Sequence, residues 1–144
     1  MLIEMSVANF RSFSGEQTFS LVKGKGDELL STNTFEATAV NNIELLRSAA
    51  IYGPNASGKS NLLLALGTMK QVVLESAVNL QRGDKLPVMP FRLSAETRQQ
   101  PSEFEVTFVV GSVRYQYGFA ASTERIHEEW LLAYPKGRAQ RWFG

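Results

Sequence analysis

The sequence contains no cysteine, a single histidine (His127) and only two aspartates (Asp27 and Asp84). Without cysteine the chain can form neither a disulfide nor a thiolate metal site, which fits a cytoplasmic protein. The lone histidine has no catalytic partner that the sequence reveals, so we interpret it as a surface or packing residue. These shortages exclude the catalytic and metal sites that depend on cysteine.

Long hydrophobic runs and an excess of charge of one sign are also missing. No apolar run approaches the roughly 20 residues that span a bilayer, and Glu4, Asn9 and Arg11 interrupt the start of the chain where a signal peptide would be apolar. The 15 basic and 14 acidic residues give a net charge of +1. That balance disfavours a strongly basic nucleic-acid surface, although a local patch is not excluded. We expect one domain's length of chain and no membrane span.

Residues 53–60 read GPNASGKS and match the P-loop pattern G-x-x-x-x-G-K-[ST]. The apolar residues 48–52 before the loop predict a buried strand, and residues 61–66 after it predict a helix. Glycine permits the backbone angles that turn successive N–H groups inward around phosphate. The start of the helix adds unpaired N–H groups and a partial positive charge. The pattern therefore predicts a site for the phosphates of ATP.

Each P-loop residue type has a role in this chemistry. Lys59 is predicted to reach the β- and γ-phosphates, and Ser60 to give its hydroxyl to Mg²⁺. Pro54 lacks an N–H group and cannot donate to phosphate. The residues predicted here to bind the nucleotide are Gly53, Asn55, Ala56, Ser57, Gly58, Lys59, Ser60 and Asn61.

Hydrolysis by a P-loop enzyme needs a further carboxylate, usually an aspartate at the end of an apolar strand. Neither aspartate follows an apolar run, and Glu128 and Glu129 are no better placed. We assign no catalytic residue and expect that residues 1–144 are an incomplete ATP-binding domain that hydrolyses little or no ATP alone.

Hydrophobic periodicity predicts several hairpins around the P-loop helix. Alternating residues predict strands over 2–10 and 17–22, over 104–110 and 113–119 across a Gly111-Ser112 turn, and over 126–134 and 138–143. The helix is predicted to run to about Asn79, with a core stripe of residues spaced by three and four. That stripe comprises Leu62, Leu66, Met69, Val73, Ala77 and Leu80. The last hairpin stops within its second strand, which indicates a fragment.

The chain resembles the N-terminal part of AAA-type ATPases of the ABC superfamily, a group that includes RecF-like and overcoming-lysogenization-defect-like proteins. It is most similar to bacterial AAA-family ATP-binding proteins found near restriction and phage-defence genes. The matching stretches are NFRSF at 9–13, QTFSL at 17–21, the P-loop with NLL at 61–63, PSEFE at 101–105, EWL at 129–131 and YPKGR at 134–138.

This resemblance implies an α/β P-loop NTPase fold of the ABC type, cut after its first lobe, with an antiparallel β subdomain around the P-loop strand and helix. It also implies that Arg11 and Ser12 lie near the phosphates or ribose. The family's later parts supply the signature helix, the Walker B carboxylate and the catalytic glutamate, and two heads sandwich ATP in a homodimer. Nucleic acid or an effector nuclease are further partners that it suggests.

Several features also have plainer interpretations. Arg11 could be a solvated charge at a strand end, and residues 23–26 could be a mobile linker rather than a basic contact. The aromatic side chains at 115, 117 and 119 fit a packed sheet face better than a base-stacking platform. Lys136 and Arg138 fit a solvated hairpin tip.

Three functions therefore stay open. The first is the ATP-binding half of an ATPase that hydrolyses ATP at full length. The second is a P-loop phosphotransferase, which is disfavoured because about fifty residues precede the P-loop. The third is a non-hydrolysing module that uses ATP to gate assembly or regulation.

Overall fold

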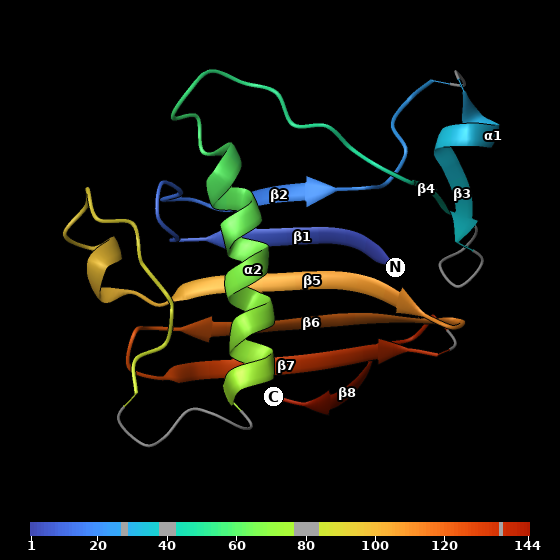
Figure 1. Ribbon diagram of the computed structural model, residues 1–144. Helices are drawn as coiled ribbons and strands as arrows, with labels where there is room; N and C mark the ends of the chain where they lie inside the picture. Colours follow the sequence, from blue (N-terminus) through green and yellow to red (C-terminus); the bar gives the residue numbers. More distant parts are fainter. Residues whose placement is uncertain (27–28, 38–42, 77–83, 136) are drawn as a thin grey trace.

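A computed structural model describes residues 1–26, 29–37, 43–76, 84–135 and 137–144. Its main feature is one antiparallel sheet in the spatial order β2-β1-β5-β6-β7-β8 (Figure 1). The strands are β1 (Leu2–Ala8), β2 (Gln17–Ser20), β5 (Ser102–Val110), β6 (Val113–Ala121), β7 (Ile126–Tyr134) and β8 (Gln140–Phe143). The three hairpins predicted from period-two alternation are confirmed, and their registers are antiparallel throughout.

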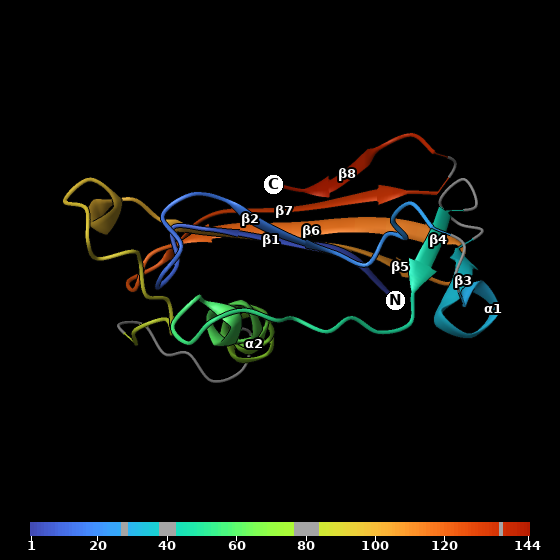
Figure 2. The same ribbon diagram turned by 90° about the horizontal axis from the view of Figure 1, so that it is seen from above.

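A single long helix, α2 (Lys59–Ser76), crosses one face of this sheet (Figures 1 and 2). Side chains from the sheet and the helix form the main core, in which the rings of Phe104 and Phe119 are in contact, tilted by 31° with centroids 5.1 Å apart. The described core residues of this cluster are Met5, Val7, Phe10, Ala65, Met69, Val72, Leu86, Val88, Phe104, Phe119 and Ala121. The aromatic residues of β6 thus pack against neighbours, as expected.

A second, smaller sheet lies at one end of the molecule. It pairs β3 (Thr34–Ala37) with β4 (Ile43–Leu46) and follows a short helix, α1 (Leu30–Asn33). Leu45 packs with Ile3 and Ala37 in a separate small core. The sequence pattern over 29–46 was too irregular to predict these elements, and the turn expected at Asn41-Asn42 lies outside the described residues.

The strand predicted before the P-loop is wrong. Residues 48–57 form neither helix nor strand, and the side chains of Ile51 and Tyr52 are 39% and 90% exposed. A parallel strand is stable only when its backbone groups pair with neighbouring strands and both faces are covered. Within the described residues no strand pairs with this segment, so its apolar character does not suffice to form one.

The buried face of α2 also differs from the prediction. Ala65, Met69 and Val72 are buried, whereas Leu66 and Val73 are 39% and 44% exposed. The predicted stripe is therefore rotated, because leucine and valine lie on both sides of the helix and the spacing does not choose between them. Ala77 and Leu80 lie outside the described residues.

Gly67 lies within α2, and a methyl group added there would meet no atom within 4 Å. Glycine costs a helix about 1 kcal/mol relative to alanine. We expect Gly67→Ala to raise the free energy of unfolding by about 0.5–1 kcal/mol, measured by urea denaturation. A decrease would show that the open space beside Gly67 is occupied in solution.

Candidate functional site

The P-loop leads directly into the start of α2. The first helical hydrogen bond runs from the N–H group of Leu62 to the carbonyl of Gly58 at 3.1 Å, and the helix begins at Lys59 as the motif predicts. The N–H groups of the first turn have no partner within the helix and face the loop side. Ser57 closes a turn in the loop by donating its N–H to the carbonyl of Pro54 at 3.3 Å. In the described geometry the helix therefore begins directly at the end of the loop.

Two glycines of the loop are explained by its geometry. Gly58 has φ +94°, in the region that favours glycine, and an added Cβ would lie 2.8 Å from the ring of Phe13. Gly53 does not have a positive φ, but its added Cβ would lie 2.9 Å from the Oγ of Ser57. Gly58 is therefore favoured by its conformation and by its close approach to Phe13, whereas at Gly53 the close neighbour is a serine hydroxyl that can rotate away.

The Lys59 ammonium folds back over the loop. Its Nζ donates to the carbonyl oxygens of Gly53 at 2.7 Å and Pro54 at 2.6 Å, and lies 3.4 Å from the Oγ of Ser57. All three acceptors belong to the loop, so the positive charge is held where the motif predicts phosphate. An incoming phosphate would compete with uncharged carbonyls for this ammonium, and a charged acceptor forms the stronger bond.

Ser60 has an exposed side chain in the first turn of α2. Among the residues that the structure describes, no group of three or more histidine, cysteine or acidic side chains could hold a metal ion. Mg²⁺ in a P-loop site is held by the loop hydroxyl together with phosphate oxygens and water. The position of Ser60 fits that arrangement.

Two hollows flank the loop. One, of about 370 Å³, is lined by Asn55 through Asn61 alone. The other, of about 380 Å³, has walls from the N-terminal hairpin and the loop, and shares Ser57, Gly58 and Lys59 with the first. It is lined by Phe13, Gln17, Thr18, Phe19, Ile51, Tyr52, Gly53, Pro54, Ser57, Gly58, Lys59 and Leu62. The N-terminal hairpin therefore forms part of the surroundings of the loop.

The NFRSF stretch forms a tight turn with Arg11 and Ser12 at its tip. Phe10 and Phe13 exchange backbone hydrogen bonds at 2.9 and 2.8 Å. Ser12 reaches the P-loop helix, because its Oγ accepts a hydrogen bond from the Nδ2 of Asn61 at 2.7 Å. The structure thus brings Ser12 and Asn61 together, two residues that the sequence predicted at the nucleotide.

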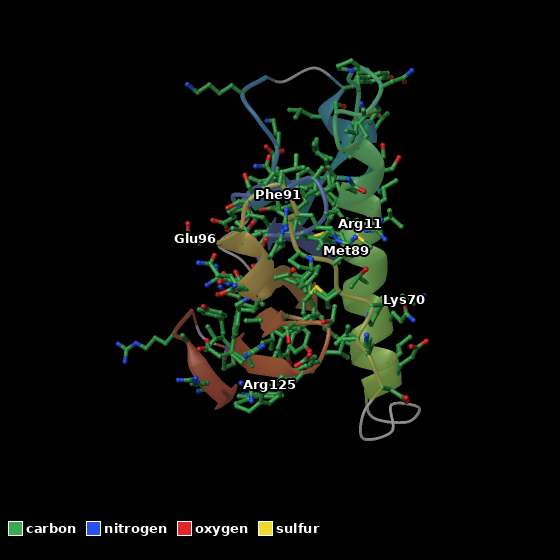
Figure 3. All side chains as sticks on the ribbon, turned by 90° about the vertical axis from the view of Figure 1, so that its left-hand side faces the viewer. Arg11, Lys70, Met89, Phe91, Glu96 and Arg125 are labelled. Carbon is green, nitrogen blue, oxygen red and sulfur yellow. The ribbon has the colours of Figure 1, made fainter. Side chains whose placement is uncertain are left out.

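Arg11, the other residue at the tip of the turn, makes different contacts from Ser12. It has φ +51°, and its N–H donates to the carbonyl of Met89 at 2.8 Å; both residues are labelled beside α2 in Figure 3. Its guanidinium lies 5.6 Å from the ring centroid of Phe10. The buried Nε makes no hydrogen bond to any described residue. Arg11 is therefore not a freely solvated charge, and its predicted contact with nucleotide stays a prediction.

Sequence reasoning missed Asn9, which holds this turn in place. Its buried side chain donates from Nδ2 to the carbonyls of Thr97, Gln100 and Pro101 at 2.8, 3.0 and 3.1 Å. Its Oδ1 accepts from the N–H of Phe91 at 3.0 Å. Asn9 has φ +50°, and asparagine is one of the few residues enriched at positive φ. An asparagine directly after a predicted strand is therefore the one local signal that could have indicated this turn.

A family model described as "AAA domain, putative AbiEii toxin, Type IV TA system" matches residues 48–143, two thirds of the chain. The chain belongs to this family. It is therefore an AAA-type P-loop ATPase domain, and its loop is a nucleotide-binding loop; the mixed α/β fold with a mostly antiparallel sheet agrees with that membership. A comparison with curated proteins finds no match. No helix among the described residues of the AAA domain is long and apolar enough to cross a membrane.

Proposed function

We propose that this AAA domain binds Mg-ATP as part of an ATPase of the ABC superfamily, of the RecF-like and overcoming-lysogenization-defect-like branch, and that the full-length protein hydrolyses ATP. The observation that carries the proposal is the Lys59 ammonium, held on the loop carbonyls of Gly53 and Pro54 at the start of α2. The packing of the NFRSF turn against that helix start supports the choice of branch.

We propose further that residues 1–144 are the first lobe of the domain. Much of the exposed side of α2 is apolar, with Leu63 and Leu74 66% and 60% exposed, although Lys70 and Gln71 also lie there. A groove of about 500 Å³ between α2 and the sheet has nearly all its lining apolar. A large exposed apolar surface on a domain marks an interaction site, which supports the existence of a second lobe. In our proposal that lobe carries the signature helix and the Walker B carboxylate.

The proposed cellular role is phage defence or another DNA-related process. The toxin–antitoxin description of the matching family supports a defence role. The proposed assembly is a homodimer with ATP sandwiched between two heads, acting on nucleic acid or through an effector nuclease.

A non-hydrolysing module in which ATP gates assembly is the alternative. It shares the P-loop and the Lys59 contacts with the first proposal and differs from it in turnover alone. A phosphotransferase gains no support from the site.

ATP turnover by the full-length protein separates these functions. We expect Mg-ATP hydrolysis that requires Lys59, together with ATP-dependent dimerisation measured by light scattering. Lys85→Ala, which removes the same charge from an exposed position that lines neither the loop hollows nor the apolar groove, is the matched control and should leave turnover unchanged. ATP binding and dimerisation without turnover would support the gating module instead, and phosphorylation of a small acceptor would support the phosphotransferase.

A further inference from the structure

The turn at the end of β1 contacts the P-loop at the point where the loop becomes a helix. Ser12 accepts a hydrogen bond from Asn61. An atom built on Gly58 would lie 2.8 Å from the ring of Phe13 and 3.2 Å from the Oγ of Ser12. Ser12 and Asn61, which are 49 positions apart in the chain, therefore meet beside the helix start whose amides the proposed function assigns to phosphate.

The turn itself is firmly held. Phe10 is fully buried and packs edge-on against Phe104 with ring centroids 5.2 Å apart. The paired hydrogen bonds between Phe10 and Phe13 close the turn, and the Arg11 N–H group bonds to Met89. Both Asn9 and Arg11 have positive φ, a conformation that costs about 1 kcal/mol or more and persists only where surrounding structure enforces it.

The loop, by contrast, is held by a few hydrogen bonds among its own exposed residues. The side chains of residues 50–57 are all exposed, and the hydrogen bonds of the loop described above run within residues 53–59. An anion site made of backbone amides binds strongly only if those amides are already in position. The support for the helix start has to come from outside the loop.

We propose that the turn of residues 10–13 is the positioning element of the P-loop. The Asn61–Ser12 hydrogen bond and the Phe13 ring fix Gly58 and the first turn of α2 in the geometry that phosphate requires. This inference rests on the proposed ATP-binding function for its purpose. Ser12 and Asn61 act here as one unit, through each other, and not as separate ligands of the nucleotide.

A double-mutant cycle of Ser12→Ala and Asn61→Ala in the full-length protein tests this unit. The first readout needs no nucleotide: amide hydrogen exchange at Leu62, whose N–H makes the first helical bond to Gly58. We expect each variant to speed this exchange about fivefold to tenfold, the factor for one net hydrogen bond, and the double variant to show no more than either single one.

The second readout is the Kd for Mg-ATP, which we expect to rise about fivefold to tenfold in each variant and no further in the double variant. The free energy of global unfolding should fall by no more than this factor represents, about 1–1.4 kcal/mol. Ser14→Ala, an exposed serine beside the turn, is the matched control and should change neither readout.

Additive losses of affinity would overturn the proposal, because they would make Ser12 and Asn61 independent ligands. Unchanged exchange at Leu62 would overturn it as well. If the variants showed coupled exchange at Leu62 but the wild-type protein bound no Mg-ATP, the proposed function would be contradicted. The role of the turn in holding the helix start would still stand.

Discussion

Replacing Lys59 with alanine is expected to weaken Mg-ATP binding about tenfold to a hundredfold. The ammonium donates to loop carbonyls that phosphate oxygens would replace as acceptors. A hydrogen bond between charged groups contributes about 1.5–3 kcal/mol, and each 1.4 kcal/mol corresponds to a factor of ten in Kd. Isothermal titration of the protein with Mg-ATP measures this loss.

Two comparisons make the result specific to the site. Lys70→Ala removes an equal charge from an exposed position on the same helix and should leave the Kd within twofold. AMP lacks the β- and γ-phosphates, so its weaker binding should be nearly insensitive to Lys59→Ala. Equal losses for AMP and ATP would contradict the placement of the ammonium at the terminal phosphates.

Replacing Asn9 with alanine is expected to lower the free energy of unfolding by about 3–5 kcal/mol. The change removes four hydrogen bonds made by a buried side chain, to the carbonyls of Thr97, Gln100 and Pro101 and from the Phe91 N–H group, all of them partly buried. Alanine also tolerates φ +50° less well than asparagine. Urea denaturation followed by circular dichroism measures the effect, and a loss below about 1 kcal/mol would contradict this role of Asn9.

Asn9→Gly separates the two contributions. Glycine accepts the left-handed conformation without cost but makes none of the four side-chain hydrogen bonds. We expect it to be about 1 kcal/mol more stable than Asn9→Ala and still well below the wild type. If the two variants were equally stable, the backbone conformation at position 9 would contribute nothing.

The sequence predicted the elements whose signal is local. Alternation over 104–119 and 126–134 located three strands because each has a face that packs against the core, as Phe104 and Phe119 do. The P-loop pattern located the start of α2, because the positions of its glycines and lysine depend on the backbone geometry of a few neighbouring residues.

Features that depend on contacts between distant parts of the chain could not be predicted from the sequence. The strand predicted over 48–52 depends on neighbouring strands that the described residues do not provide. The buried side of α2 is set by which face meets the sheet, and leucines on both sides hide that choice. The contact of Ser12 with Asn61 joins distant parts of the chain, and no spacing rule reports it.

The central claim is that the backbone amides between Asn55 and Ser60, completed by the Lys59 ammonium, bind the phosphates of ATP. Backbone amide NMR during a titration with Mg-ATP tests it most directly. We predict that the largest shifts occur at Gly58, Lys59 and Ser60, saturate with the Kd found by calorimetry, and need about tenfold to a hundredfold more Mg-ATP in Lys59→Ala. Shifts confined to the apolar groove beside Leu66 and Tyr117, with the loop amides unmoved, would contradict the account.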